Sequence, residues 1–227
     1  MVLCNQRDVK ALEDGGEHVH LNGTGDNYFE FVELLGKGKY GIVDRVRSRQ
    51  TLKHYARKCI HRGVSATLDS RMYRQFEGEI QALKRLSHPH IVKLVGSYTD
   101  KDNLGVIMTP IADMNLEEFL TSQKSPILRN RSLPEYFGCL ATALAYLHQQ
   151  DVRHNDIKPR NVLVKDSKVY LADFGTSRSW GAEEISTTVG MHEGYTPRYA
   201  APETHDTNGP RNRASDVWSL GCVYLEM

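Results

Sequence analysis

Short apolar runs separated by a polar turn mark the chain around residue 165. The apolar run 162–164 is followed by four polar residues, 165–168, and then by a second run at 169–172. Two such runs around a polar turn predict a β-hairpin. The polar residues that flank the hairpin would therefore lie at strand ends, which a hairpin brings together.

A helical pattern occupies residues 71–87. Apolar side chains recur there at intervals of about 3.6 residues: Met72, Phe76, Ile80, Leu83 and Leu86. Glu79 lies at the apolar edge of this predicted helix, where a buried carboxylate needs a cation as its partner. Gly78 lowers the stability of the helix by about 1 kcal/mol relative to alanine, so we expect a mobile element.

The remaining segments mix strands and helices. We expect strands at 54–60, 91–94 and 104–108. We also expect a short helix that Asn115 caps and that runs through Leu120, a long helix from Leu133 to Gln149, and a further apolar helix from Asp216. Residues 1–27 show no sustained period and contain two glycine-rich turns, which predicts a flexible lead-in. His18 and His20 are expected to be solvated there, because no third metal ligand accompanies them. The pattern predicts an α+β fold.

Composition and charge exclude several classes of protein. Of the 227 residues, 40% are hydrophobic and 25% are charged, which is enough for one large domain or two small ones. The net charge of +1, from 29 basic and 28 acidic residues, creates no overall field that would attract nucleic acid or a membrane surface. No apolar run approaches the roughly 20 residues of a membrane span, and the first ten residues lack the apolar core of a secretory signal.

The cysteines are widely spaced along the chain, at Cys4, Cys59, Cys139 and Cys222. They form no C-x-x-C pair, so neither a zinc site nor a disulfide framework is expected. A reducing, intracellular compartment, the cytoplasm or the nucleus, fits this cysteine usage best.

Polar side chains suited to phosphoryl transfer flank the predicted hairpin. Asp156, Lys158 and Asn161 precede it, and Asp173 follows it. Magnesium prefers oxygen ligands, which Asn161 and Asp173 supply. Phosphoryl transfer also needs a carboxylate that orients the attacking hydroxyl and a cation that steadies the moving group, and Asp156 and Lys158 suit these roles.

The order of these residues resembles a known catalytic core. The chain has H-x-D-x-K-x-x-N at 154–161 and D-F-G at 173–175, which is similar to the eukaryotic protein kinase family. The alternative, a charged surface hairpin, does not explain five functional residue types at the required offsets. The resemblance covers 28–227 and implies a two-lobed fold: a small antiparallel β-sheet N-lobe with one helix at about 28–108, a hinge at 109–113, and a mostly helical, incomplete C-lobe at 114–227.

A glycine-rich segment supports the same interpretation. Residues 36–43 follow G-x-G-x-x-G-x-V, although dinucleotide-binding folds use the same glycine spacing before a helix. The residues after Gly41 are β-branched and charged, which favours a strand, so the glycines would form the tip of a hairpin. Glycines there let backbone N–H groups approach phosphate oxygens closely.

Lys58 is expected to point inward from its strand. Alternation with a period of two places Ala56, Lys58 and Ile60 on one face, and A-x-K matches the family's pattern. The resemblance implies that Lys58 pairs with Glu79 and reaches the α- and β-phosphates of ATP. Glu77 is the rival candidate for this ion pair.

The resemblance also implies an ATP site and the cofactors ATP and Mg²⁺. The expected ATP-binding residues are Leu35, Gly36, Gly38, Gly41, Val43, Ala56, Lys58, Met108, Ile111 and Leu163. Met108 would be the gatekeeper. Ile111 would donate its backbone N–H to adenine, because Pro110 has no N–H to donate.

Residues 173–203 resemble an activation segment. Its expected members are Asp173, Phe174, Gly175, Thr187, Thr188, Thr196, Ala201, Pro202 and Glu203. The lysine at position 158 and the threonine at position 196 are similar to the residues that serine/threonine kinases have in these motifs. We expect Thr196 to hydrogen-bond both Asp156 and Lys158. Asn155 replaces the arginine with which many relatives hold a phosphorylated loop, so phosphorylation of this segment should matter little.

The implied function is a serine/threonine protein kinase that acts on a protein hydroxyl, with Asp156 as the base. The alternative is a truncated, catalytically silent domain that acts as a nucleotide-binding or interaction module. The family's domain continues with further helices, so we expect residues 1–227 alone to be aggregation-prone and weakly active. A small-molecule phosphotransferase would not be expected to carry D-F-G followed by A-P-E.

Overall fold

The chain divides into two compact units. The computed structural model describes residues 6–38, 41–63, 65–122, 126–179, 196–204 and 212–227. The first unit comprises Met1–Lys84 and Val92–Ile111, and the second comprises Arg85–Ile91 and Ala112–Met227. The later boundary, after Ile111, falls inside the hinge expected at 109–113.

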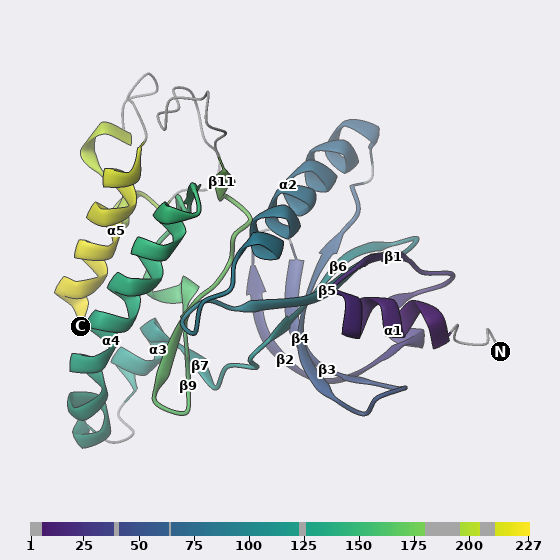
Figure 1. Cartoon of the computed structure of the whole chain (residues 1–227), viewed down its shortest axis with the longest axis horizontal. Coiled ribbons are helices and arrows are strands. Elements are labelled where there is room, and N and C mark those ends of the chain that lie inside the picture. Colours follow the sequence, from purple (N-terminus) through teal and green to yellow (C-terminus); the bar gives the residue numbers. More distant parts are fainter. Residues whose placement is uncertain (1–5, 39–40, 64, 123–125, 180–195, 205–211) are drawn as a thin grey trace. The chain divides into compact units, whose positions relative to one another are not determined.

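The first unit is a β-sheet that carries helices. Its strands are β1 (His18–His20), β2 (Phe29–Gly38), β3 (Gly41–Ser48), β4 (His54–His61), β5 (Lys93–Thr99) and β6 (Asn103–Thr109), and its helices are α1 (Gln6–Gly15), the 3-10 turn η1 (Gly25–Asn27) and α2 (Ala66–Arg85). The six strands lie in the order β1-β5-β6-β4-β3-β2. Only β1 is parallel to its neighbour, so the predicted antiparallel sheet is confirmed with one parallel addition (Figure 1).

The amino-terminal segment is structured, so the prediction of a flexible lead-in is wrong for residues 6–27. α1 buries Leu12, and the residue after β1, Leu21, is also buried, in a core cluster with Tyr98 and Ile107. The unit therefore has two helices besides η1, where one was expected. The segment has few apolar residues, and they pack against strands that lie far along the chain. Most of the stability of such a short helix comes from tertiary packing, which a local pattern does not reveal.

Helix α2 confirms the predicted amphipathic pattern. Phe76, Ile80 and Leu83 are buried, although the helix begins earlier than expected, at Ala66. Lys58 contacts Glu79 of α2, so the sheet face that carries Lys58 is the face that meets this helix.

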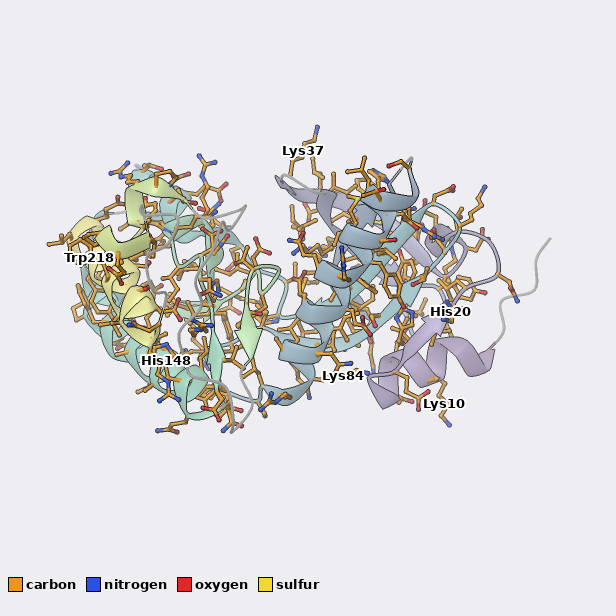
Figure 2. All side chains as sticks on the ribbon, turned by 90° about the horizontal axis from the view of Figure 1, so that it is seen from above. Lys10, His20, Lys37, Lys84, His148 and Trp218 are labelled. Carbon is orange, nitrogen blue, oxygen red and sulfur yellow. The ribbon has the colours of Figure 1, made fainter. Side chains whose placement is uncertain are left out.

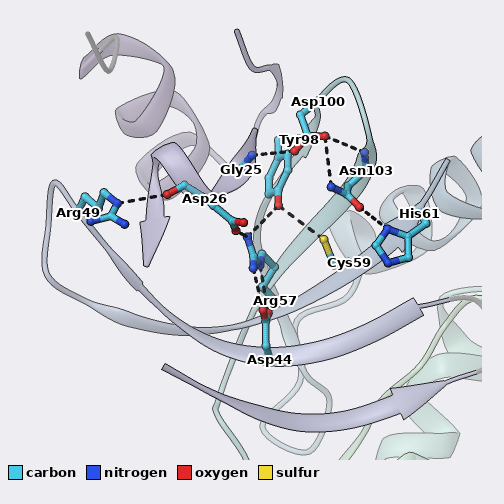
Figure 3. A network of polar contacts seen from close by, with 10 residues as sticks. All are labelled: Gly25, Asp26, Asp44, Arg49, Arg57, Cys59, His61, Tyr98, Asp100 and Asn103. Carbon is cyan, nitrogen blue, oxygen red and sulfur yellow. Dashed lines mark hydrogen bonds and ion pairs between the residues drawn. The ribbon is translucent and has the colours of Figure 1, made fainter. Parts of the chain in front are cut away.

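A buried polar network lies on the other face of the sheet (Figure 3). Arg57 of β4 is only 5% exposed and donates from Nε and Nη2 to the two carboxylate oxygens of Asp44, at 3.1 and 2.7 Å. Its Nη1 donates to Oδ1 of Asp26 at 2.8 Å. Burial opposes the guanidinium charge, but the hydrogen bonds to Asp44 and Asp26 outweigh it and raise the pKa of Arg57. Since Asp26 belongs to η1, the network ties the amino-terminal segment to the sheet.

A second anchor of this segment depends on a glycine. The backbone N–H of Gly25 donates to Oδ2 of Asp100 at 2.7 Å. A Cβ on Gly25 would clash with the ring of Tyr98. Only glycine therefore allows the chain to approach the sheet this closely.

The second unit contains helices and small sheets. Its elements are β7 (Met114–Asn115), α3 (Leu116–Thr121), α4 (Pro126–Gln149), β8 (Val152–Arg153), η2 (Pro159–Asn161), β9 (Val162–Lys165), β10 (Lys168–Leu171), β11 (Arg178–Ser179), η3 (Pro197–Tyr199), η4 (Pro202–Thr204) and α5 (Arg213–Glu226). The sheets have the orders β10-β9-β7 and β11-β8. The predicted hairpin is confirmed, because Val162 pairs with Leu171 and Lys165 with Lys168.

Helix ends in this unit show where local signals succeed and fail. Asn115 caps α3, as predicted, and forms a capping box with Glu118. The backbone N–H of Glu118 donates to Oδ1 of Asn115, and the backbone N–H of Asn115 donates to Oε2 of Glu118, both at 3.0 Å. The prediction that α4 opens at Leu133 and Pro134 is wrong, because α4 begins at Pro126 and contains Pro134. Both prolines are compatible with a helix start, and the sequence alone did not identify Pro126 as the first residue.

Helix α5 buries one side and exposes apolar residues on the other. Asn212 caps it, and the helix begins at Arg213, close to the expected start at Asp216. Leu220 and Val223 are buried, whereas Trp218 is 50% exposed and projects from the outer side of α5 (Figure 2). Among the described helices, none combines the length and the apolar character needed to cross a membrane.

Candidate active site

Hydrogen bonds and an ion pair hold Asp156 firmly in the second unit. Asp156 is 7% exposed, and its Oδ2 accepts from Nζ of Lys158 at 2.6 Å and from Nδ2 of Asn161 at 3.1 Å. Asn161 also donates to the backbone carbonyl of Asp156 at 2.8 Å. A cation and an amide therefore fix the orientation of this carboxylate.

Thr196 joins the same cluster from a distant part of the chain. Its Oγ1 donates to Oδ1 of Asp156 at 3.0 Å and accepts from Nζ of Lys158 at 2.9 Å. Both predicted hydrogen bonds of Thr196 are present. A carboxylate oxygen has two lone pairs, so the bond from Thr196 leaves Oδ1 able to accept a second hydroxyl.

Asp216 fixes the backbone of the loop, a role that the sequence analysis missed. Its Oδ2 accepts from the backbone N–H of His154 at 2.9 Å, and its Oδ1 accepts from that of Asn155 at 2.8 Å. Nε2 of His148 lies 3.1 Å from Oδ2. Asp216 is buried, in a helix that was expected only to be apolar. The available signal was a carboxylate within an apolar stretch, which needs partners when it is buried.

Asn161 and Asp173 lie together at the end of the hairpin. The backbone N–H of Ala172 donates to the carbonyl of Asn161 at 2.9 Å, which brings Asp173 beside Asn161. Asp173 is exposed, and its neighbour Phe174 is buried with its ring 5.0 Å from that of His154. Both hydrogen bonds to Asp156 use Nδ2 of Asn161, and the Oδ1 atom of the same amide is an acceptor. One amide oxygen and one exposed carboxylate are oxygen donors that suit a magnesium ion.

In the first unit, Lys58 and Glu79 form a close ion pair. Nζ of Lys58 lies 2.8 Å from each carboxylate oxygen of Glu79. Glu79 is 1% exposed, whereas Glu77 is on the exposed side of the helix. The structure therefore pairs Lys58 with Glu79 and not with the rival Glu77. A buried carboxylate this close to an ammonium group holds that group in place.

The glycine-rich segment is a hairpin, as the residues after it predicted. Gly38 at the end of β2 pairs with Gly41 at the start of β3. Gly36 lies earlier in β2. A Cβ on Gly41 would clash with the backbone carbonyl of Cys59, so this position requires glycine. A strand follows Gly41, and the dinucleotide-binding alternative, which needs a helix there, is excluded.

The other residues expected at the nucleotide lie mostly on the sheet face of Lys58. Ala56 pairs with Met108, and Val43 pairs with Lys58, so cross-strand neighbours bring all four to one face. Leu35 is exposed in β2. Ile111 is the last residue of the first unit, and Leu163 is a half-buried residue of β9 in the second.

Parts of the expected activation segment are described. Asp173, Phe174 and Gly175 follow β10, and Ala201, Pro202 and Glu203 lie in and before η4. Oε1 of Glu203 accepts from Oγ of Ser215 at 2.8 Å. Nδ2 of Asn155 donates to the carbonyl of Thr176 at 2.9 Å. Thr187 and Thr188 lie outside the described residues.

Known proteins resemble this chain over most of its length. The protein kinase domain model matches residues 29–227. Serine/threonine-protein kinase nekl-2 of Caenorhabditis elegans is 30% identical over 89% of the chain, and Nek4 of Mus musculus is 35% identical over 87%. Mitogen-activated protein kinase kinase kinase 6 of Homo sapiens is 35% identical over 96%. The chain spans 57%, 24% and 17% of the lengths of these three proteins.

The matched family model covers well over half of the chain, and the fold and the cluster around Asp156 agree with it. The chain belongs to the eukaryotic protein kinase superfamily, among the serine/threonine kinases.

Proposed function

We propose that this chain is a serine/threonine protein kinase that transfers the γ-phosphate of ATP to a hydroxyl of a protein substrate. The observation that supports the proposal most is Asp156, whose Oδ2 is held by Lys158 at 2.6 Å and whose Oδ1 is reached by Thr196 at 3.0 Å. A fixed carboxylate with one oxygen open to a hydroxyl is suited to act as a general base.

In the proposed reaction, Asp156 accepts the proton of the substrate hydroxyl. The hydroxyl oxygen forms a bond to the γ-phosphorus, the bond from that phosphorus to the bridging oxygen breaks, and ADP leaves with the electron pair. Lys158, which lies 2.6 Å from the base, steadies the negative charge on the moving group.

The resemblance to protein kinases suggests which residues would contact the nucleotide. Lys58, kept extended by Glu79, would contact the α- and β-phosphates, and the hairpin glycines would donate backbone N–H groups to phosphate oxygens. We assign the remaining adenine and ribose contacts to Leu35, Val43, Ala56, Met108, Ile111 and Leu163. Asn161 and Asp173 would hold Mg²⁺, which neutralises charge on the phosphates when it is bound.

The substrate class follows from the catalytic loop and the relatives. Lys158 and Thr196 are the residue types of serine/threonine kinases, and two of the three relatives carry that description in their names. We therefore propose Ser or Thr of a protein as the acceptor. A cytoplasmic or nuclear location fits the widely spaced cysteines.

Transfer of labelled γ-phosphate to peptide libraries with Ser, Thr or Tyr at a fixed position tests the proposal. The wild-type chain should label the Ser and Thr libraries in the presence of Mg²⁺. Asp156→Asn should abolish transfer and leave ATP affinity nearly unchanged, because Asp156 contacts neither adenine nor metal in the proposed roles. Asp173→Asn should instead weaken binding of the magnesium–ATP complex.

Asp166→Asn is the matched control, since Asp166 is an exposed aspartate in the turn of the same hairpin. It should transfer phosphate at the wild-type rate. If Asp156→Asn lost ATP binding along with transfer, the role of base would be wrong. Nucleotide binding without any transfer by the wild-type chain would support the silent nucleotide-binding module instead.

A further inference from the structure

The amino-terminal strand extends the sheet on the face that carries Lys58. Successive strand registers pair one residue from each of five strands in a single cross-strand row: Val43, Lys58, Val106, Ser97 and His18. Paired residues of neighbouring strands share a face of the sheet. His18 of β1 therefore lies on the same face as Lys58, at the far end of the row.

His18 is fixed by contacts on several sides. Its Nδ1 lies 3.0 Å from Oγ of Ser97, and its Nε2 lies 3.1 Å from Oγ1 of Thr99. Its ring packs edge-on against Phe76 of α2, with ring centroids 5.7 Å apart and planes at 71°. The expectation that His18 is solvated is therefore wrong. His20, on the same face, is exposed and packs edge-on against His18 at 5.0 Å.

His18 contacts α2 at Phe76, about one helical turn before Glu79, which forms the ion pair. Phe76 and Glu79 stand three positions apart along α2, so they lie on one face of the helix. Both are buried. His18 meets the first of them, and Lys58 meets the second. A displacement of this turn of α2 relative to the sheet would move Glu79 away from Lys58.

This turn of α2 needs external support. Gly78 lies within it, and a glycine in a helix interior lowers stability by roughly 1 kcal/mol relative to alanine. Among the described residues, and apart from its chain neighbours and the backbone of α2 itself, nothing lies within 4 Å of the position where a Cβ of Gly78 would be. Packing by His18 on Phe76 supplies a contact on the sheet side.

The segment that carries His18 is anchored on the opposite face of the sheet. Arg57 binds Asp26, and Asp100 binds the N–H of Gly25 (Figure 3). Glu13 of α1 accepts from Oγ1 of Thr51 at 2.6 Å and from the hydroxyl of Tyr55 at 3.0 Å. These anchors do not involve His18, so β1 should keep its place when the imidazole is replaced.

We propose that His18 is a positioning residue for the Lys58–Glu79 ion pair, acting through Phe76. It follows that residues 6–27, which precede the matched kinase domain at 29–227, are a working part of the catalytic domain. The effect on catalysis rests on the proposed function, whereas the effect on α2 does not.

Replacement of His18 in the whole chain tests the proposal by two independent measurements. The first is kcat and KM for ATP, and the second is hydrogen exchange of backbone amides in residues 74–84 of α2. His18→Ala should lower kcat/KM about tenfold, which is less than the roughly hundredfold loss that a misplacement of about 1 Å can cause. The same change should raise amide exchange in α2. His18→Phe retains an aromatic ring for Phe76, and it should restore both values toward the wild type.

Two control variants separate positioning from general loss of stability. His20→Ala alters the same strand and face and should leave kcat/KM and α2 exchange near the wild-type values. Leu21→Ala removes a buried side chain of the same segment from the core cluster that contains Tyr98 and Ile107. It should lower the melting temperature at least as much as His18→Ala, without raising α2 exchange selectively.

The outcomes are distinguishable. Wild-type exchange in α2 for His18→Ala, or an equal rise for Leu21→Ala, overturns the positioning role. A selective rise in exchange with no transfer by the wild-type chain supports the positioning role and refutes the kinase proposal.

Discussion

Arg57 and Lys58 are consecutive residues of β4 that bind partners on opposite faces of the same sheet. Arg57 donates to both oxygens of Asp44 and to Asp26, while Lys58 lies 2.8 Å from both oxygens of Glu79. Because successive strand residues alternate between faces, one strand is held by charged contacts from both sides. The structural ion pair and the candidate catalytic ion pair are thus direct neighbours.

Loss of Arg57 should destabilise the first unit strongly. Arg57→Ala leaves the carboxylate of Asp44, which is 1% exposed, buried without its cation, and breaking a buried pair in this way costs about 3–5 kcal/mol. Urea denaturation followed by fluorescence measures the loss. Arg47→Ala is the matched control, because the pair that Arg47 forms with Glu30 is exposed and should contribute less than about 1 kcal/mol. Equal losses in the two variants would contradict a dominant role for the buried network.

Reversal of either charge in the Lys58–Glu79 pair should remove most of the activity. Lys58→Glu and Glu79→Lys each place like charges together, and the double variant restores opposite charges. A double-mutant cycle on kcat/KM should therefore be non-additive, with a coupling of about 0.5–3 kcal/mol. Glu77→Lys, an exposed change on the same helix, serves as the control and should be nearly silent. Additive effects of Lys58→Glu and Glu79→Lys would show that the two side chains act separately.

Phosphorylation of the activation segment should change turnover less than tenfold. Asn155 carries no charge that could pair with a phosphate, and its Nδ2 already donates to the carbonyl of Thr176 at 2.9 Å. The candidate sites Ser186, Thr187 and Thr188 lie outside the described residues. Turnover of a phosphatase-treated sample is compared with that of a phosphorylated one. A rate change well above tenfold would refute the prediction.

Acid should destabilise the chain partly through His18 and His88. Burial, and then the nearby His20 and Lys84, lower the pKa of His18, and burial and His90 lower that of His88. The unfolded chain therefore binds protons first, near the ordinary histidine pKa of about 6.5. Stability is complete above that pH and falls as the pH drops through it toward the lower pKa values of the folded state.

The melting temperature at about pH 7.5 and pH 5.5 measures this dependence. The wild-type chain should melt at a lower temperature at the acidic pH. His18→Phe should reduce the difference, because phenylalanine binds no proton, and adding His88→Phe should reduce it further. A difference that is unchanged in both variants would mean that other groups cause the acid sensitivity.

The sequence by itself determined the local features of the candidate site. The spacing within H-x-D-x-K-x-x-N and the hairpin after it placed Asp156, Lys158 and Asn161 in one loop. The period of two in β4 put Lys58 on the inner face, and Asn115 as a cap marked the start of α3. These features depend on neighbours within a few residues, so a local pattern carries them.

Only the tertiary structure decided which distant groups complete the site. Asp216 binds the backbone of His154 across a separation of 62 residues, and Gly25 binds Asp100 across 75. The family resemblance already implied Glu79 as the partner of Lys58, whereas the contact of His18 with Phe76 depends on how α2 packs on the sheet. A local pattern shows at most that a carboxylate such as Asp216 or Glu79 needs a partner when it is buried. Which distant group becomes that partner is decided only when folding brings the two together.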